Sequence, residues 1–328
     1  MSKPATALYK EAARLIQNAE RILFASHINP DGDTLGSACA LAHLAEQAGK
    51  TVQLFCQDSV PEQYSFLVGS AGYSSKVNEL TPADLLVVLD CSEPWRLGEE
   101  AEQLLKVAPR ALNIDHHAGG TPLGEVNLLD TTAAAAGVLV HELLAELGWQ
   151  VDLPVAEALY TAIDTDTGSF RYPNTDARSL RVVADLIESG LRPNKVAERL
   201  YESNRPQKYR LLGKALDTLE LLHDGGLALL IVTEAMYAET GASVEDTAVI
   251  VDYARGISGV EVGAFLRQDG AEKVKLSLRS KDGVAVNDLV KPIGGGGHRC
   301  AAGATFTGTL AEARDWVVEA VGKELNNL

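Results

Sequence analysis

Short apolar runs alternate with longer amphipathic segments through the first half of the chain. The runs cover residues 21–25, 51–55, 85–89 and 111–114, and a segment of helical spacing, TLGSACALAHLAEQAG, follows the first of them. Strands that are buried on both faces have such short continuous apolar runs, and their alternation with helices indicates βαβ units. The pattern therefore predicts a doubly wound α/β domain built on a parallel sheet.

The pattern changes twice further along the chain. From about residue 133 to residue 190 it is mostly helical, and we expect these helices to cover the sheet. Residues 191–210 are polar and contain two prolines, which indicates a linker. Residues 211–328 return to strand-like alternation before a final helical segment. The sequence thus predicts an α/β domain over residues 1–190, a linker, and a smaller mixed-sheet α/β domain over residues 211–328.

Composition narrows the classes of partner. The chain has 328 residues, with 29 Lys and Arg against 45 Asp and Glu, and its formal net charge of -16 disfavours binding to a long polyanion such as duplex DNA. The four cysteines form no C-x-x-C pair, which is typical of reduced thiols rather than disulfides or a zinc knuckle. No apolar run approaches the roughly 20 residues that cross a bilayer, and the N-terminal segment lacks a signal-peptide core. We expect a cytoplasmic protein without a membrane partner.

Three groups of ligand-type side chains directly follow predicted strands. They are His27, Asp31 and Asp33 in HINPDGD, Asp90 at the end of LLVVLD, and the DHH segment at residues 115–117. The carboxyl ends of parallel strands share one edge of a sheet, where ligands bind. An aspartate of the first group could instead cap a helix that begins near Thr34. Capping would have to recur independently at each strand, so a common binding site is the better interpretation.

A fourth acidic group, DTDTG, contributes Asp164 and Asp166 after a helical segment. Its simplest alternative is a helix end with an Asx turn. Taken together, the groups are rich in oxygen and imidazole and offer no plausible thiolate, which favours Mn²⁺ over metals that seek thiols. Five or six such ligands suit two metal ions that share a carboxylate, an arrangement that supports displacement at phosphorus.

The motifs HINPDGD, LLVVLDCS, NIDHH and LYTAIDTDTGSFRYPNT, followed much later by GGGGH, resemble the DHH phosphoesterases that carry a DHH-associated C-terminal domain. The order and spacing fit over nearly the whole chain, and the likeness is greatest to the nanoRNase and pAp phosphatase group. The resemblance implies two Mn²⁺ ions, with Mg²⁺ or Co²⁺ as alternatives. One ion would be held by His27, Asp31 and Asp90, and the other by Asp33, Asp90, His116 and Asp166.

The resemblance also assigns roles around these ligands. Asp90 would bridge the two ions, and Asp164 would not be a ligand. Asp115 would orient a neighbouring group. His117 would face the scissile phosphate and stabilise charge or protonate the leaving oxygen, although a structural hydrogen bond to its loop is the alternative.

In the second domain the resemblance implies substrate binding from the far side of an interdomain cleft. The residues are Arg279, His298, Gly296, Gly297 and Asn287. Glycines let backbone N–H groups approach an anion, and a helix start after GGGGH would strengthen that effect. Residues 267–299 contain seven Lys or Arg against four Asp or Glu, a local cationic excess in an acidic chain. For Arg279 the alternative is a solvated strand residue.

The resemblance therefore implies a manganese-dependent phosphoesterase in which two metals activate a bridging water. It would hydrolyse short oligoribonucleotides (nanoRNA) to 5′-mononucleotides and adenosine 3′,5′-bisphosphate (pAp) to AMP plus phosphate. A phosphodiesterase for cyclic di-AMP or the small dinucleotide pApA is an alternative within the family, and a nucleotide-binding protein without turnover is an alternative outside it. The sequence leaves the oligomeric state open, with a homodimer as one option.

Overall fold

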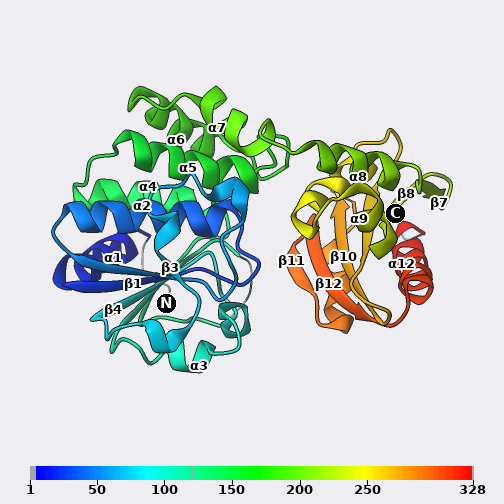
Figure 1. Cartoon of the computed structure of the whole chain (residues 1–328). Coiled ribbons are helices and arrows are strands. Elements are labelled where there is room, and N and C mark those ends of the chain that lie inside the picture. Colours follow the sequence, from blue (N-terminus) through cyan, green and yellow to red (C-terminus); the bar gives the residue numbers. More distant parts are fainter. Residues whose placement is uncertain (1–4, 118, 120, 282, 327–328) are drawn as a thin grey trace. The chain divides into compact units, whose positions relative to one another are not determined.

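A computed structural model describes residues 5–117, 119, 121–281 and 283–326. The chain forms two compact units that divide between Ser203 and Asn204 (Figure 1). The segment expected to be a linker, residues 191–210, holds helix α7 (Pro193–Tyr201) and the first turn of α8 (Pro206–Leu216). Its two prolines each stand at the first position of one of these helices, where proline is favoured because no backbone N–H donor is needed.

The first unit is built on a parallel sheet with the strand order β3-β2-β1-β4-β5-β6. The strands are β1 (Arg21–Ala25), β2 (Thr51–Phe55), β3 (Tyr73–Ser74), β4 (Leu85–Leu89), β5 (Ala111–Asp115) and β6 (Val126–Leu129). Every residue of β4 is buried, as its continuous apolar run predicts. The strand order reverses between β1 and β4, which is the position where ligands bind in doubly wound sheets. The predicted fold class of this domain is confirmed.

Helices cover both faces of this sheet. They are α1 (Ala5–Asn18), α2 (Gly32–Gln47), α3 (Ala101–Leu104), α4 (Ala136–Leu147), α5 (Leu153–Asp166) and α6 (Ala177–Glu188). Alternate residues of β1 enter opposite cores: Ile22 packs with α1, α2, α4 and α5, whereas Leu23 packs on the face that α3 covers. Of the helix pairs, α2 and α5 make the most extensive contact. This pair carries ligand-type residues at the N-terminus of α2 and the C-terminus of α5.

The second unit is a smaller α/β domain with a mixed sheet. Its strand order is β11-β12-β10-β9-β8-β7, and only the β8–β9 pair is parallel. The strands are β7 (Glu220–Leu222), β8 (Leu227–Val232), β9 (Val262–Gln268), β10 (Lys273–Ser280), β11 (Gly296–His298) and β12 (Ala301–Thr307). The mixed sheet was also predicted from the sequence, and the prediction is confirmed.

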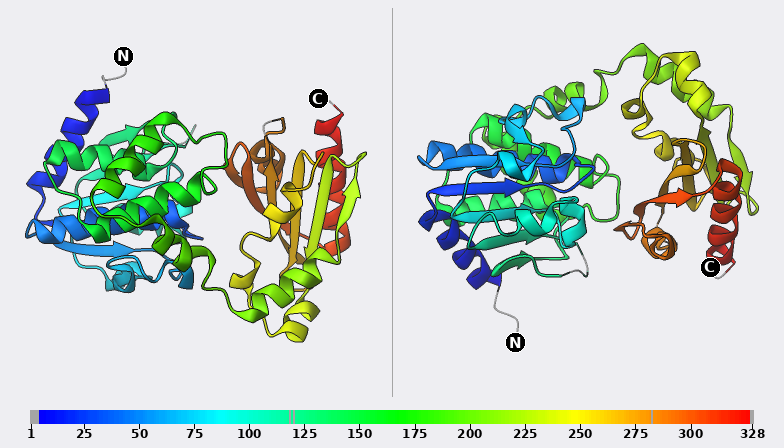
Figure 2. Two further views of the ribbon diagram at one scale, coloured as in Figure 1. Left: turned by 90° about the horizontal axis from the view of Figure 1, so that it is seen from above. Right: turned by 60° about the horizontal axis from the view of Figure 1, so that its bottom comes forward.

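Each face of the second sheet has its own helices. Besides α8 they are α9 (Glu234–Thr240), α10 (Ile250–Arg255), α11 (Val286–Val290) and α12 (Leu310–Leu325). Val317 of α12 packs on one face, and Ala254 of α10 packs on the other; Figure 2 shows α12 in red along the sheet. Six short 3-10 helices complete the described elements: η1 (Glu62–Tyr64), η2 (Ser70–Gly72), η3 (Val77–Glu79), η4 (Pro94–Leu97), η5 (Val244–Thr247) and η6 (Lys291–Ile293). Over the described residues, no helix has both the length and the apolar character that a membrane span requires.

Candidate metal centre

The ligand-type residues of the first unit converge at the carboxyl edge of its parallel sheet. Three groups of side chains offer ligand atoms that lie within 4.8 Å of one another. The groups are His27, Asp31 and Asp90; Asp33, His116 and Asp166; and Asp90, His116 and His117. All six metal ligands expected from the sequence are therefore brought together, and His117 lies beside them.

Asp90 stands between two imidazoles. Its Oδ2 lies 3.4 Å from Nε2 of His27, and its Oδ1 lies 3.3 Å from Nε2 of His116. Its backbone has a φ of 53°, in the left-handed region that non-glycine residues rarely occupy. Such strain is retained where the surrounding structure fixes it, and it is frequent at functional sites. The side chain of Asp90 thus presents a different oxygen to each half of the centre.

In the second half of the centre, two carboxylates lie close to the imidazole of His116. Its Nε2 lies 3.6 Å from Oδ2 of Asp33 and 3.5 Å from Oδ2 of Asp166. Its other ring nitrogen, Nδ1, is 3.0 Å from the carbonyl oxygen of Ala133 and donates to it, which turns Nε2 towards the carboxylates. His27 is fixed in the same way, with Nδ1 2.8 Å from the carbonyl oxygen of Ile28.

The two aspartates of HINPDGD, Asp31 and Asp33, make different contacts. Only Asp31 caps the helix that follows the motif. Asp31 is the N-cap of α2, and its carboxylate accepts from the backbone N–H groups of Asp33 and Thr34. The helix begins at Gly32, so the expected start near Thr34 was two residues too late. Asp31 thus caps the helix, and its Oδ2 also lies 3.7 Å from Nε2 of His27.

Asp33 makes its contacts far along the chain. Its oxygens accept from the N–H groups of Ala136 at 2.6 Å and Gly137 at 2.9 Å, the first residues of α4. The N-cap of that helix, Ala135, has no side-chain cap of its own. Since the first N–H groups of a helix have no partner within the helix, Asp33 takes over the capping of α4. The same carboxylate is fully buried and faces His116.

His117 is oriented by Asp115. Oδ1 of Asp115 lies 2.7 Å from Nδ1 of His117 and also accepts from the backbone N–H of His116 at 2.8 Å. The hydroxyl of Ser92 donates to the other oxygen, Oδ2. The orienting role expected of Asp115 thus falls on His117, which is partly exposed. Sequence reasoning missed Ser92, because a serine two residues after Asp90 carries no signal of its own.

Burial and neighbouring charges shift the pKa values of the aspartates and of His116 in the centre. Burial, reinforced by Asp90, raises the pKa of Asp33 well above its usual value, and burial raises the pKa of Asp166 to about 7. Burial opposes ionisation of Asp90 as well, but His117 and the other imidazoles outweigh it and hold its pKa well below the usual range. Burial disfavours the charged form of His116, yet the surrounding carboxylates raise its pKa well above normal. The centre therefore concentrates negative charge that a cation can neutralise.

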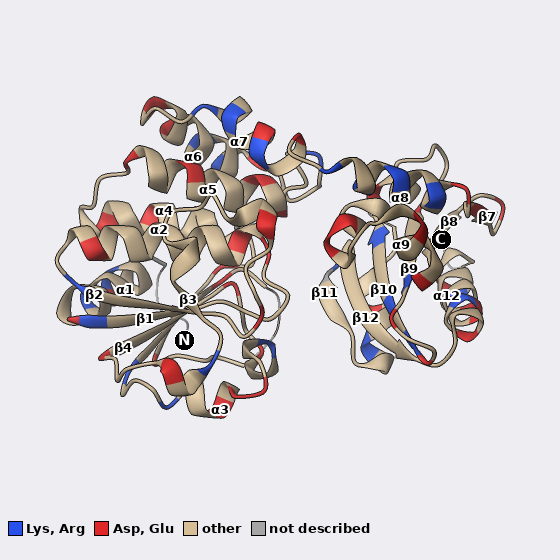
Figure 3. Ribbon diagram, in the orientation of Figure 1, with Lys and Arg blue, Asp and Glu red and all other residues tan. Residues whose placement is uncertain are grey.

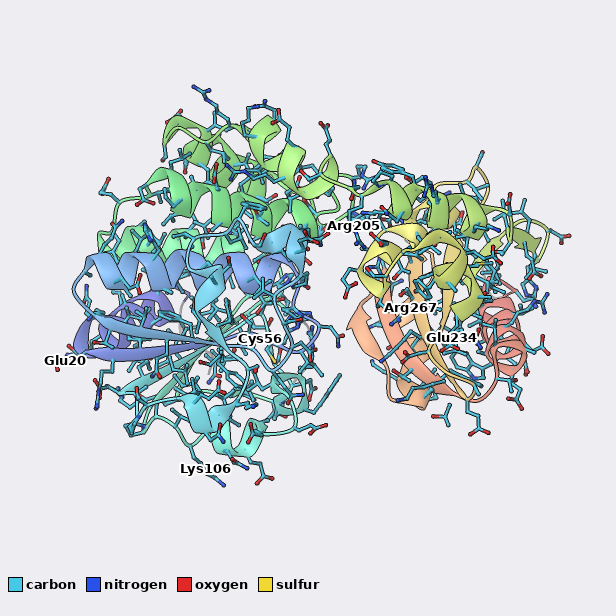
Figure 4. All side chains as sticks on the ribbon, viewed as in Figure 1. Glu20, Cys56, Lys106, Arg205, Glu234 and Arg267 are labelled. Atoms are coloured by element: carbon cyan, nitrogen blue, oxygen red, sulfur yellow. The ribbon has the colours of Figure 1, made fainter. Side chains whose placement is uncertain are left out.

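The donors fit a divalent cation. Among the described residues, Nε2 of His27 and Oδ1 of Asp90 are buried without a hydrogen-bond partner, and such atoms are costly unless a further group satisfies them. The nearby thiols lie outside these groups of ligand atoms: the thiol of Cys56 (labelled in Figure 4) donates to the carbonyl oxygen of His27, and the thiol of Cys91 donates to that of Glu93. Oxygen and imidazole donors without thiolate suit Mn²⁺, Mg²⁺ or Co²⁺.

Comparisons with known proteins place this geometry in a family. A model described as "DHH family, N-terminal domain" matches residues 21–163, and a model described as "DHHA1 domain" matches residues 228–327. The chain is 36% identical over 324 residues to the bifunctional oligoribonuclease and PAP phosphatase NrnA of Thermus thermophilus, covering 97% of this chain and 95% of that protein. The chain belongs to the DHH phosphoesterase family. The family resemblance and the prediction of an enzyme are confirmed.

Further relatives agree with the DHH assignment. The protein of the same name from Bacillus subtilis is 26% identical over 299 residues, covering 90% of this chain and 92% of that protein. The crystal structure of an exopolyphosphatase-related protein from Bacteroides fragilis has a TM-score of 0.90 and 25% identity, with 98% of each chain covered. Both units of the DHH chain, with their topology, thus recur in a solved structure.

The second unit, which contains the DHHA1 domain, holds the remaining residues expected from the sequence. Arg279 is half-buried in β10, where its Nη1 donates to the carbonyl oxygen of Leu278 at 3.1 Å. Asn287 lies in α11, and its Oδ1 is buried without a hydrogen-bond partner among the described residues. Figure 3 shows the lysine and arginine residues of β9 and β10 in blue. The predicted cationic stretch therefore includes two neighbouring strands.

The GGGGH segment of the DHHA1 domain differs from its expected form. Gly296 and Gly297 lie in the edge strand β11, which pairs with β12, and no helix starts after them. The idea that a helix start would strengthen anion binding here was wrong. Gly297 has a φ of 135°, and a β-carbon there would lie 2.4 Å from the carbonyl oxygen of Ala301, so only glycine fits. His298 ends this strand, and its side chain lies outside the described part of the structure.

Proposed function

We propose that this DHH chain is a manganese-dependent phosphoesterase that hydrolyses short oligoribonucleotides to 5′-mononucleotides and pAp to AMP plus phosphate. The observation that carries the proposal is the position of Asp90, whose Oδ2 lies 3.4 Å from Nε2 of His27 and whose Oδ1 lies 3.3 Å from Nε2 of His116. The names of the NrnA relatives support the substrates. The net charge of -16 agrees with short substrates rather than long polyanions.

Two divalent cations would be held by the side chains that converge on Asp90. His27, Asp31 and Asp90 are the proposed ligands of one, and Asp33, Asp90, His116 and Asp166 are those of the other. When bound, such a pair would lower the pKa of the attacking water and neutralise charge on the phosphoryl oxygens. The buried atoms of His27 and Asp90 that lack hydrogen bonds support this assignment.

We assign proton donation to the leaving oxygen to His117. Although burial disfavours its charged form, Asp90 and Asp115 raise the pKa of this imidazole, which favours the protonated form that a proton donor needs. Asp115 fixes Nδ1, which leaves Nε2 as the atom that transfers the proton. The side chain of His117 is 15% exposed, compared with 2% for Asp90, and is therefore the more accessible to substrate.

In the DHHA1 domain, Arg279, His298 and Asn287 are the proposed contacts to the substrate, together with the backbone N–H groups of Gly296 and Gly297. The cationic excess around β9 and β10 supports this role, as does the buried Oδ1 of Asn287, which has no hydrogen-bond partner among the described residues. Arginine is suited to it because its planar guanidinium binds phosphate through two parallel hydrogen bonds.

The decisive experiment is hydrolysis of a substrate panel by the purified full-length chain with Mn²⁺. The panel contains pAp, RNA of two to five nucleotides, pApA, cyclic di-AMP and pyrophosphate, and the products are separated by ion-exchange chromatography. We expect AMP from pAp and 5′-mononucleotides from RNA. Faster turnover of cyclic di-AMP or pApA would replace the proposed substrates, and binding without hydrolysis of any member would refute the enzyme.

A further inference from the structure

Asp164, the first aspartate of DTDTG, has no place among the proposed metal ligands, yet it is nearly as buried as they are. It lies in the last turn of α5 and is 3% exposed. Its Oδ2 accepts a hydrogen bond from the hydroxyl of Tyr201, the last residue of α7. The hydroxyl of Ser169, in turn, lies 3.2 Å from the Tyr201 hydroxyl and donates to it. The Tyr201 hydroxyl therefore connects the carboxylate of Asp164, which precedes Asp166 in the sequence, to the hydroxyl of Ser169, which follows it.

The chain that follows Asp166 has an unusual conformation. Gly168, Ser169 and Phe170 have consecutive φ values of 56°, 56° and 60°. Left-handed backbone is unfavourable for residues with a β-carbon, and it persists only where surrounding contacts hold it. The backbone N–H of Ser169 donates to the carbonyl oxygen of Asp164 at 2.7 Å, and that of Phe170 donates to Oγ1 of Thr167 at 3.2 Å. Tyr201 adds a side-chain contact to this turn.

Asp166 lies between these two anchored positions. It is the last residue of α5, its carboxylate faces His116 at 3.5 Å, and its carbonyl oxygen accepts from Nδ2 of Asn174 at 3.1 Å. The direction of its side chain depends on how the helix end and the left-handed turn are held. Because the Tyr201 hydroxyl contacts both sides of Asp166, its hydrogen bonds restrain the backbone that aims this carboxylate.

We propose that Tyr201 is a positioning residue that fixes the orientation of Asp166 through Asp164 and Ser169. The inference rests on the proposed function, in which Asp166 binds a metal ion. Tyr201 acts on Asp166 through its hydrogen bonds to Asp164 and Ser169 on either side of it. It also stands two residues before the boundary between the two units at Ser203, so the end of the first unit is attached to the loop of its metal centre.

The exposure of Tyr201 makes the idea testable by a mild substitution. The residue is 38% exposed, so Tyr201→Phe removes the hydroxyl without emptying a core position. We expect Mn²⁺ binding, measured by electron paramagnetic resonance of free Mn²⁺, to weaken about 10-fold at the site that includes Asp166, the lower end for residues that orient a ligand. We also expect kcat for pAp to fall while KM changes less, since substrate contacts are untouched.

Two further variants separate positioning from general destabilisation. Ser169→Ala removes the other end of the same contact, and the double variant with Tyr201→Phe is expected to bind Mn²⁺ no more weakly than the more affected single variant, because the two residues act as one unit. Tyr209→Phe is the matched control: this tyrosine is 57% exposed, lies in α8 and accepts one hydrogen bond, from Asn204. Its Mn²⁺ affinity and kcat are expected to match those of the wild type.

The outcomes distinguish this inference from the function on which it rests. If the wild type binds Mn²⁺, and Asp166→Asn weakens binding but Tyr201→Phe does not, the positioning role is wrong while the metal centre stands. Fully additive losses in the double variant would also overturn the role of Tyr201. If the wild type itself binds no Mn²⁺, the proposed metal centre fails, and the inference fails with it.

Discussion

Gly36 of α2 lies so close to Ala158 of α5 that a β-carbon on Gly36 would be 2.3 Å from the Ala158 carbonyl oxygen. The contact sets the separation of two helices whose ends carry proposed ligands, Asp33 on α2 and Asp166 on α5. We expect Gly36→Ala to force the helices apart and to lower the free energy of unfolding by about 1–3 kcal/mol, the usual cost of overpacking. Urea unfolding followed by circular dichroism measures this loss.

Gly213 of α8 provides the matched control for that substitution. A β-carbon at Gly213 meets nothing within 4 Å, and the residue is inside a helix. We expect Gly213→Ala to stabilise the chain by about 0.4–1 kcal/mol, because alanine restricts the unfolded state. Equal effects of the two substitutions, in either direction, would contradict the close packing of α2 against α5.

Asp90→Asn is expected to abolish turnover of pAp and to remove one or both metal ions. Asparagine tolerates the left-handed backbone at this position, so the change removes charge and one oxygen ligand without adding strain. Metal content after dialysis, measured by mass spectrometry, is the direct test, and kcat is the second. The control is Asp185→Asn, since the Asp185 side chain is 62% exposed. Full activity of Asp90→Asn with two ions bound would exclude the bridging role.

Arg279→Ala is expected to raise KM for pAp or to slow its turnover, with the metal content unchanged. The physical reason is the loss of a guanidinium that is half-buried in β10 and positioned to bind phosphate. Lys323→Ala is a suitable control, because Lys323 is an exposed cation of α12 outside this cationic stretch. Unchanged kinetics of Arg279→Ala on every substrate would remove this residue from the binding site.

The metal-free protein is expected to lose stability as the pH rises from about 4 to about 7. An aspartate ionises near pH 4 in the unfolded chain, whereas burial raises the pKa of Asp166 to about 7 in the folded chain. Between these values the folded state binds more protons than the unfolded state, so stability falls with increasing pH. The raised pKa of Asp33 acts in the same direction from about pH 4 upwards, and the raised pKa of His116 does so from about pH 6.5 upwards.

Divalent cations are expected to reverse this loss. The rise in the thermal unfolding midpoint on adding Mn²⁺ to chelator-treated protein is therefore expected to be greater at pH 8 than at pH 5.5, since cations compete with protons for the same carboxylates. Asp166→Asn serves as the control, because it removes one of these carboxylates and reduces the difference. The same Mn²⁺ effect at both pH values would contradict the raised pKa of Asp166.

The parallel sheet and its ligand-bearing edge could be predicted because both depend on local sequence. Residues 85–89 are apolar without interruption, which indicates a doubly buried strand, and Asp90 follows directly. Contacts across long sequence distances could not be predicted in this way. The bonds from Ala136 and Gly137 to Asp33 join residues more than 100 positions apart and depend on the packing of α4 beside α2.

The strand conformation of the glycine-rich segment also depends on the residues that pair with it. GGGGH has the composition of a turn, and the sequence did not reveal that residues 301–303 pair with it as a strand. Tyr201 likewise gave no signal, because an isolated tyrosine at the end of a polar helix is common. Its contact with Asp164 arises only when α7 packs against α5.

The double use of Asp33 affects how related sequences can be interpreted. The Asp33 carboxylate caps the N-terminus of α4 and is also a proposed metal ligand, so both folding and catalysis constrain this residue. A descendant that had lost catalysis would still need this aspartate to fold. Its retention in another chain is therefore poor evidence of activity, whereas Asp90, which the described structure gives no comparable task in folding, is the position whose loss would identify an inactive homologue.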